Sequence, residues 1–503
     1  MEIQVITSLL DTVEADLLVV GLFESLTAPG YEAFDAPLRG LIGQVVGLGD
    51  FKGEANKTTL LYTPGGTPAG RLLLVGLGKP DAFTADTARR AAGVAAQTMV
   101  KLQVRRVAVA VPGLGQEIAA PGSLAQAMVE GTLLGLYRFA GYRRSGAANG
   151  AQVEVLQLVV PPGTPVEAFQ RGVRVGEVMG EASNQARDLT NAVGNLLPPR
   201  ELAARAQSLT EGTGIVCTVY GEETMREWGM GALLSVSQGS AEEAQFIVME
   251  YFPAAAATQE TLVLVGKAVT FDTGGISIKP ADKMWLMKSD MGGGAAVIGA
   301  MRAIARLQLP VRVVGLVCAA ENMPGSKAIK PGDVVRALNG KTIEYISTDA
   351  EGRMVLADGL AFAERYTPAA IIDCATLTGT MTRALGLELS GVFCNDDALY
   401  ARLSQASTRA GEPIWRMPLW QPYRERIDSD VADMKNSGGL PGGAINAALF
   451  LNEFVPSGTP WAHFDIAATA FQETDRAFMT RGATAVPARL LVELVRDWSG
   501  ETA

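Results

Sequence analysis

The sequence predicts an α/β protein with two domains, each a mostly parallel sheet covered by helices, the C-terminal domain being the larger. Three observations predict this fold class. The chain has 503 residues, more than one hydrophobic core usually organises. Short β-branched runs alternate with helical stretches, an order typical of parallel sheets. A proline-rich cluster, Pro161-Pro-Gly-Thr-Pro165, is the best boundary signal and divides the chain into domains at 1–165 and 166–503.

The elements of the first domain follow from their residue patterns. β-branched runs predict four strands, at 16–23, 71–78, 106–111 and 155–160. Apolar periodicity predicts two helices, at 85–102 and 124–139.

The second domain is expected to begin with a helix over 166–188, and Pro198-Pro199 then interrupts the chain before a second βα series. Its predicted strands cover 214–220, 244–252, 261–271, 311–319 and 369–375. A further helix is expected over 295–309, where apolar residues recur on one helical face.

Charge and composition narrow the class of partner. The formal charge of -10 opposes broad affinity for nucleic acid or anionic membranes, so small-molecule or peptide partners are favoured. The first ten residues lack a basic region and a long apolar run, so we expect a cytoplasmic protein without membrane association. Four widely spaced cysteines in apolar runs indicate buried thiols, neither a disulfide framework nor a thiolate metal site.

The histidine count limits the metal chemistry. His463 is the one histidine of the chain, so a catalytic metal would be held mainly by carboxylates or less usual ligands. The apolar setting Trp461-Ala-His-Phe-Asp465 favours a packed core histidine over a catalytic one.

Three motifs carry candidate chemistry, and the first follows the strand at 261–271. This segment places Lys267, Asp272 and Lys279 around a glycine turn, and ligand sites in α/β sheets gather at such strand ends. The structural alternative gives Asp272 a turn-capping role and leaves both lysines as solvated charges.

The second motif, Lys288-Ser-Asp290-Met-Gly-Gly-Gly294, places Asp290 at the start of a helix. Asp290 could be a plain N-cap, while the glycines would allow close approach of a ligand or another chain segment. The spacing typical of a phosphate loop is missing, and an aspartate at the entrance would repel phosphate.

The third motif, Asp349-Ala-Glu351-Gly-Arg353, packs two carboxylates and a guanidinium into five residues before a helix. If the segment is extended, alternate residues face one side and these three groups converge. A functional role is favoured over a structural capping cluster.

Taken together, the motifs favour a dinuclear metal site in a catalytic C-terminal domain. Asp272, Asp290, Asp349 and Glu351 supply four negative charges, which match two divalent cations bridged by carboxylates. Lys267 could join as a nitrogen ligand only with a neutral amine, which adjacent cations would favour.

These residues closely resemble the leucyl aminopeptidase family, the dinuclear metallopeptidases of the cytosol aminopeptidase and bacterial aminopeptidase A type. The resemblance covers roughly 187–494 in the family's order. It is carried by Val265-Gly-Lys-Ala-Val-Thr-Phe-Asp-Thr-Gly-Gly275, Glu321-Asn-Met-Pro324, Thr348-Asp-Ala-Glu-Gly-Arg353, Ala375-Thr-Leu-Thr-Gly379, Ala432-Asp-Met434 and Trp461-Ala-His463.

The resemblance implies a role for each matching residue. One metal would be held by Lys267, Asp272, Asp290 and Glu351, and the other by Asp272, Asp349 and Glu351. Lys279 and Arg353 match the family's catalytic pair, with a bicarbonate ion at Arg353 as the group thought to transfer protons. The residues that match the pocket for the first side chain are Met287, Thr376 and Gly379.

The expected activity is removal of N-terminal residues, leucine and other apolar ones preferred, from short peptides. Two divalent ions, manganese or zinc, would lower the pKa of a bridging water and produce hydroxide near neutral pH, while Lys279 would stabilise the oxyanion. The substrate's free α-amine would coordinate a metal, which explains exopeptidase selectivity. The resemblance also implies a homohexamer.

Two other functions remain as alternatives. Some bacterial relatives double as DNA-binding or recombination-accessory proteins on the same fold, although the charge of -10 weighs against nucleic acid. A metal-dependent phosphoesterase could use the same carboxylates, but no phosphate-cradling loop accompanies them. Ser347, Ser289 and the Gly292-Gly-Gly294 run depart from the family pattern without removing a proposed ligand.

Overall fold

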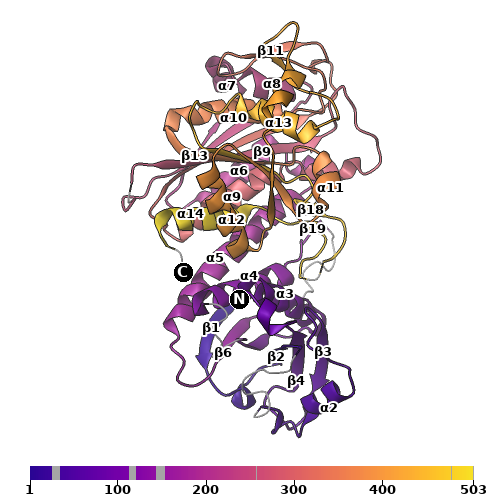
Figure 1. Ribbon diagram of the computed structural model, residues 1–503, viewed down its shortest axis with the longest axis vertical. Coiled ribbons are helices and arrows are strands. Elements are labelled where there is room, and N and C mark those ends of the chain that lie inside the picture. Colours follow the sequence, from indigo (N-terminus) through magenta and orange to yellow (C-terminus); the bar gives the residue numbers. More distant parts are fainter. Residues whose placement is uncertain (25–33, 113–119, 143–152, 257, 477, 502–503) are drawn as a thin grey trace. The chain divides into compact units, whose positions relative to one another are not determined.

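The computed structural model of the chain describes residues 1–24, 34–112, 120–142, 153–256, 258–476 and 478–501. Two compact units are present. The first comprises Met1–Asn184 and Thr474–Arg481, and the second comprises Gln185–Glu473 and Gly482–Thr502. Each unit contains a mixed, mostly parallel sheet with flanking helices, and the second is the larger, so the predicted fold class is confirmed (Figure 1).

The first unit is built on a six-stranded sheet whose neighbours are parallel except for the last pair, β4 and β3. All four predicted strands and both helices are present, while two edge strands were not predicted. In spatial order the strands are β1 (Glu2–Thr7), β6 (Val155–Val160), β5 (Arg106–Ala110), β2 (Leu17–Leu22), β4 (Arg71–Gly76) and β3 (Thr58–Tyr62). The helices are α2 (Leu41–Gly47), α3 (Ala85–Leu102) and α4 (Pro121–Leu136).

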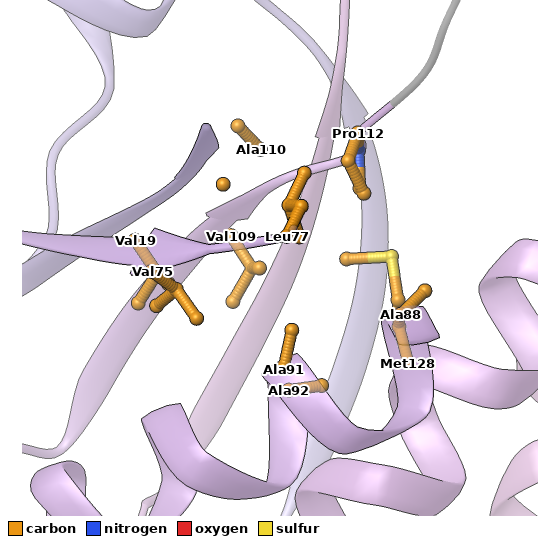
Figure 2. A pocket seen from close by; sticks show the side chains of 11 residues that line it. Val19, Val75, Leu77, Ala88, Ala91, Ala92, Val109, Ala110, Pro112 and Met128 are labelled. Atoms are coloured by element: carbon orange, nitrogen blue, oxygen red, sulfur yellow. The ribbon is translucent and has the colours of Figure 1, made fainter. Parts of the chain in front are cut away.

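A small cavity lies in this unit between the sheet and α3 (Figure 2). Its volume is about 20 Å³, enough for roughly one water molecule, and its walls include Val75, Leu77, Ala91 and Met128. All of its lining residues are apolar or glycine, so the walls offer no charged side chain and no strong hydrogen-bonding side chain to a ligand.

The second unit is built on an eight-stranded sheet in which β9 is flanked by two parallel neighbours, β13 and β10. The strands in spatial order are β15 (Ile414–Met417), β14 (Ser390–Cys394), β17 (Trp461–Asp465), β13 (Pro368–Ala375), β9 (Thr261–Asp272), β10 (Arg312–Asn322), β8 (Gln245–Tyr251) and β7 (Val216–Tyr220). The five strands predicted here are confirmed.

Helices cover both faces of this sheet, which explains why eleven of the twelve residues of β9 are buried. In Figure 1 one group lies on one side of β9 and β13 and a second group on the other. The first group is α8 (Gly231–Ser237), α10 (Gly352–Phe362) and α13 (Gly443–Asn452); the second is α6 (Pro199–Thr210), α9 (Gly292–Arg306), α12 (Asp397–Ala410) and α14 (Ala488–Ser499). The predicted helices correspond to α9 and to α5 (Glu167–Asn191), whose residues belong to both units.

Smaller elements complete the second unit. A three-stranded sheet combines β11 (Val334–Arg336), β12 (Thr342–Glu344) and β16 (Met434–Lys435), and β18 (Phe471–Gln472) pairs with β19 (Gly482–Ala483). Other helices of this unit include α7 (Glu222–Trp228), α11 (Thr380–Leu385) and the 3-10 helix η4 (Met284–Ser289). Within the described ranges, no helix combines the length and the apolar character that crossing a membrane requires.

Two predictions about single residues can now be compared with the structure. His463 is fully buried on β17 and its Nδ1 lies 2.6 Å from Asp373, so the packed-core interpretation is confirmed. Three cysteines are buried as expected, but Cys217 is only partly buried because β7 is the edge strand of the sheet.

Candidate functional site

A register shift at the end of β9 brings Lys267 and Asp272 to the same side of the sheet. Residues five apart in a regular strand face opposite sides. In the pairing with β10, Val269 and Asp272 lie opposite Ala320 and Asn322, so β9 contains one extra residue at this point. The bulge reverses the facing of the residues that follow it.

The predicted glycine turn follows β9 directly. Gly274 and Gly275 have φ values of +87° and +65°, the left-handed region that glycine adopts without strain. The turn returns the chain so that Lys279 donates its backbone N–H to the Thr273 carbonyl at 2.9 Å. Its side chain then reaches Asp272, with Nζ 2.7 Å from Oδ2.

The solvated-charge interpretation of Lys267 and Lys279 is wrong, because both ammonium groups are held by carboxylates. Lys267 Nζ donates to Asp290 Oδ1 at 2.9 Å, to Glu351 Oε1 at 2.8 Å and to the Thr376 carbonyl at 2.8 Å. Lys279 Nζ lies between Asp272 and Asp349. The turn-capping role of Asp272 is present in addition, since its Oδ1 accepts the Gly274 N–H at 2.8 Å.

Asp290 is not the N-cap of α9. Met291 occupies that position, and α9 begins at Gly292. The Asp290 carboxylate instead accepts hydrogen bonds from Lys267 and from the Thr376 hydroxyl, the latter at 2.6 Å. The glycines serve close packing, because a Cβ at Gly293 would lie 2.0 Å from the Cys374 carbonyl oxygen.

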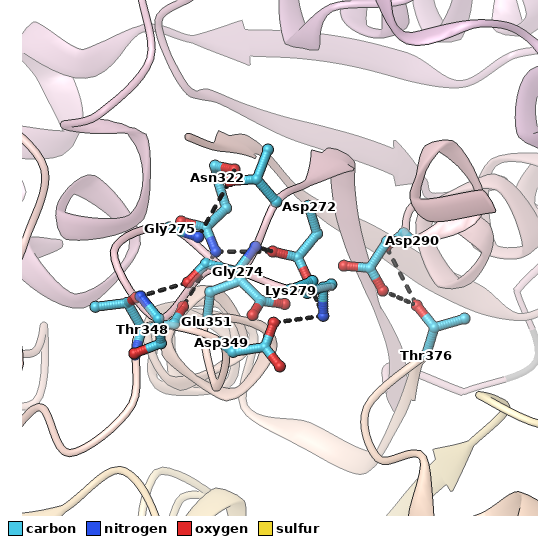
Figure 3. A network of polar contacts seen from close by, with 12 residues as sticks. Asp272, Gly274, Gly275, Lys279, Asp290, Asn322, Thr348, Asp349, Glu351 and Thr376 are labelled. Atoms are coloured by element: carbon cyan, nitrogen blue, oxygen red, sulfur yellow. Dashed lines mark hydrogen bonds and ion pairs between the residues drawn. The ribbon is translucent and has the colours of Figure 1, made fainter. Parts of the chain in front are cut away.

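The extended conformation expected for Asp349, Glu351 and Arg353 is also wrong. Thr348 and Asp349 form a turn, and α10 begins at Gly352 with Glu351 as its N-cap. The glycine is required here, since a Cβ at Gly352 would lie 2.6 Å from Lys267 Nζ. A turn followed by a helix start, and not strand alternation, brings Glu351 to Lys267. The same turn brings Asp349 to Lys279 (Figure 3).

Burial and mutual repulsion act against ionisation of the aspartates. Burial, reinforced by the charge of Glu351, raises the pKa of Asp272 to about 6 although Lys279 and Lys267 oppose the change. Burial likewise raises the pKa of Asp290 well above its usual value. For Glu351 burial is outweighed by Lys267 and Lys279, which lower its pKa. In both lysines burial is outweighed by the surrounding carboxylates, so their pKa values rise.

The donor set fits a divalent metal. One ligand atom each from Asp272, Asp290 and Glu351 lies within 4.8 Å of the others, and all three residues are buried. Oε2 of Glu351 is buried and accepts no hydrogen bond in the described part of the chain. The four carboxylates and two ammonium groups leave a formal excess of two negative charges. Oxygen ligands with excess negative charge are the set that hard divalent cations prefer.

Arg353 lies at the same helix start and has spare hydrogen-bonding capacity. Its Nη1 donates to the Asn436 carbonyl at 2.6 Å, while Nε has no partner among the described residues. Burial lowers the pKa of Arg353 to about 10, although Glu351, Asp465 and Asp349 oppose the change. A nearly buried guanidinium with a free donor is suited to bind an anion.

The three predicted pocket residues lie on different segments. Thr376 contacts Asp290 and Lys267 directly. Met287 belongs to η4 and accepts the Asp290 N–H through its carbonyl at 3.2 Å. Gly379 precedes α11, and a Cβ there would meet no atom within 4 Å.

Three buried residues that hold this site were not predicted as site residues. The side chain of Asn322 contacts Asp272, and that of Asn436 accepts N–H groups of Ile346 and Ser347 at 2.8 and 3.2 Å. Asp465 accepts the Thr378 hydroxyl at 2.5 Å and so supports the loop after β13. Asn322 and Asp465 stand inside motifs quoted above. Asn322 and Asn436 are uncharged amides, which give no signal of their own in the sequence.

Comparisons with known proteins show the family to which the chain is similar. The chain matches the models of the cytosol aminopeptidase family, catalytic domain, over residues 184–492, and of the same family's N-terminal domain over 19–146. A relative from Roseiflexus castenholzii, described as a probable cytosol aminopeptidase, is 48% identical over 486 residues, 96% of each chain.

Solved structures resemble the whole chain. A mutant of tomato leucine aminopeptidase is 32% identical with a TM-score of 0.90, covering 98% of this chain and 96% of its own. The bottromycin maturation enzyme BotP in complex with Mn is 36% identical with a TM-score of 0.85, covering 96% of this chain and 100% of its own.

Proposed function

The chain belongs to the cytosol aminopeptidase family and is a metallo-aminopeptidase, and from this premise we propose that it uses two divalent cations to release N-terminal residues from short peptides. We propose that leucine and other apolar residues are preferred. The observation that carries the proposal is the convergence of buried Asp272, Asp290 and Glu351 on one centre beside Lys267.

The ligands of the two cations are proposed from the family resemblance, and the contacts of Lys267 with Asp290 and Glu351 support the first set. Lys267, Asp272, Asp290 and Glu351 would hold one cation, and Asp272, Asp349 and Glu351 the other. Two cations in such a site lower the pKa of water and polarise a carbonyl group. Manganese is favoured because BotP is described in complex with Mn, and zinc is the second candidate.

The lysines have different proposed roles. Lys267 carries a proton on Nζ in the metal-free centre and would have to lose it to act as a nitrogen ligand. Lys279 is more accessible, with 22% of its side chain exposed against 3% for Lys267. It would keep its proton and offer the ammonium group to the oxyanion that forms at the scissile carbonyl.

Arg353 is proposed to hold the anion that transfers protons, and bicarbonate is the candidate. The support is the guanidinium Nε, which has no hydrogen-bond partner among the described residues, while Nη1 is anchored to Asn436. A planar fork binds a carboxylate-like anion through two hydrogen bonds, which a lysine cannot reproduce.

Substrate selection would depend on the free N-terminus. The neutral α-amine is an additional metal ligand, and its acetylation removes the lone pair that coordinates. Met287, Thr376 and Gly379 are proposed to line the pocket for the first side chain. The family relationship is also the support for a cytoplasmic location and for a homohexamer. Sedimentation velocity would test the homohexamer.

Hydrolysis of Leu-p-nitroanilide and of its N-acetylated counterpart tests the proposal. We expect chelator treatment to abolish cleavage of the free-amine substrate and added Mn²⁺ or Zn²⁺ to restore it, with the acetylated substrate cleaved slowly under every condition. Elemental analysis of the restored enzyme should give two ions per chain. Equal cleavage of both substrates, or activity that persists without metal, would contradict the proposal.

A further inference from the structure

Asn322 is a buried neutral residue at the edge of the proposed metal centre. It is the last residue of β10, directly opposite Asp272 on β9, and 2% of it is exposed. It is neither a proposed ligand nor a proposed catalytic group. Its side chain nevertheless contacts two of the three chain segments that supply the proposed ligands.

The side chain joins the two segments through one nitrogen. Nδ2 donates to Asp272 Oδ1 at 2.8 Å and to the Thr348 carbonyl at 3.0 Å (Figure 3). The backbone carbonyl of Asn322 accepts the N–H and the hydroxyl of Thr273, at 3.0 and 2.8 Å. Asn322 therefore holds the end of β9 and the turn that contains Asp349.

The contact with Asp272 decides which carboxylate oxygen is available. Oδ1 already accepts two neutral donors, the Gly274 N–H and Asn322 Nδ2, both at 2.8 Å. Oδ2 faces Lys279 Nζ at 2.7 Å. Two neutral donors on one oxygen fix the rotation of the carboxylate without cancelling its charge, so the other oxygen is left for a cation.

The contact with Thr348 fixes the turn that follows. The carbonyl held by Asn322 belongs to the residue before Asp349, and the Thr348 hydroxyl accepts the Ser277 N–H at 2.8 Å from the glycine turn. The fit is close, because a Cβ at Gly275 would lie 2.8 Å from Asn322 Oδ1. A primary amide is required here, since it places two donors on a single atom without adding charge.

We propose that Asn322 is a positioning residue that couples Asp272 to the Thr348–Glu351 turn and thereby sets the affinity of the cation shared by Asp272 and Asp349. The inference rests on the proposed function, since it assumes that these carboxylates bind metal. Loss of residues that orient metal ligands typically lowers metal affinity by about 10–100-fold.

The test uses the full-length protein, freed of metal by a chelator and titrated with Mn²⁺ in a calorimeter. Asn322→Ala removes both donors, and Asn322→Asp keeps the shape while replacing them with an acceptor. Asn446→Ala is the matched control, because Asn446 is a fully buried amide on α13 whose Nδ2 donates to the Pro441 carbonyl outside the cluster. Thermal midpoints of the metal-free proteins report on folding separately.

We expect both Asn322 variants to bind one Mn²⁺ about 10–100-fold more weakly than the wild type, while the control binds both ions normally. Activity of Asn322→Ala should recover at high Mn²⁺, because the ligands themselves are intact. Unchanged Mn²⁺ affinity with a lowered metal-free midpoint would overturn the inference and leave Asn322 a purely structural amide. A wild type that binds no Mn²⁺ would instead refute the proposed function.

Discussion

Replacing Lys267 by methionine should destabilise the metal-free protein because the ammonium group is the main counter-charge of the buried carboxylates. The substitution keeps most of the side-chain volume but leaves Asp290 and Glu351 without the donor that lies 2.8–2.9 Å from each. Removing one partner of a buried ion pair costs about 3–5 kcal/mol. At about 2 °C per kcal/mol, the expected loss in Tm is roughly 6–10 °C.

The sign of the pH dependence fixes the conditions of this measurement. The carboxylates raise the pKa of Lys267 in the folded protein, so its stabilising contribution is complete below the unfolded pKa of 10.5 and is lost as pH rises through the folded value. At pH 8 the contribution is therefore complete. That pH also lies above the pKa of about 6 at Asp272, so this carboxylate is ionised.

Thermal unfolding of metal-free wild type and Lys267→Met at pH 8 measures the effect. Lys341→Met is the control, because Lys341 pairs with Glu453 at 2.5 Å but 38% of its side chain is exposed, and such a pair contributes about 1 kcal/mol or less. Both proteins are kept free of metal, because Lys267 is itself a proposed ligand and its loss would also weaken metal binding. A metal-free variant as stable as the wild type would refute the reasoning.

Three further predictions concern single residues of the second unit. Glu351→Ala should abolish turnover and lower the Mn content, whereas Arg353→Lys should keep the metal and slow turnover. Elemental analysis and kcat measure the two effects, and a Glu351→Ala variant that keeps both its Mn content and its turnover would contradict the prediction. Because burial raises the pKa of Asp272 to about 6, Mn²⁺ affinity should fall by up to about tenfold per pH unit below pH 6. A Mn²⁺ affinity that calorimetry finds unchanged with pH would disprove this prediction. The pKa of His463 is raised because Asp373 outweighs the effect of burial, so the single imidazole signal of ¹⁵N-histidine-labelled protein should titrate above pH 6.5. The contribution of protonated His463 to stability is then complete below pH 6.5 and is lost as pH rises through the pKa of the folded protein. An imidazole that is already neutral at pH 6 would contradict this prediction.

The fold could be predicted where burial leaves a continuous apolar pattern. β9 and β6 are buried on both faces, and their runs of valine and leucine predicted them closely. β1 was missed because it is an edge strand of mixed polarity with no fully buried residue. β17 was missed as a strand because its five residues include a histidine and an aspartate whose burial depends on tertiary partners.

The site could be predicted in its residue types but not in its geometry. Carboxylates, lysines and glycines next to strand ends are visible in the sequence, and the structure brings Lys267, Asp272, Asp290 and Glu351 together. The convergence depends on the bulge between β9 and β10 and on a helix that begins at Gly352, neither of which follows from local spacing. Asn322 could not be recognised for the same reason, because its partners are set by strand register.

The lysine contacts allow charge balance and packing to be distinguished as the source of stability in the metal-free centre. Lys267 and Lys279 offset two of four carboxylates, and the remaining repulsion contributes to the raised pKa of Asp272. Removing Lys267 adds to this repulsion, whereas Glu351→Gln relieves it while nearly preserving shape. If charge balance governs the metal-free centre, Lys267→Met should destabilise it far more than Glu351→Gln. If only packing matters, two conservative changes at equally buried sites should cost about the same.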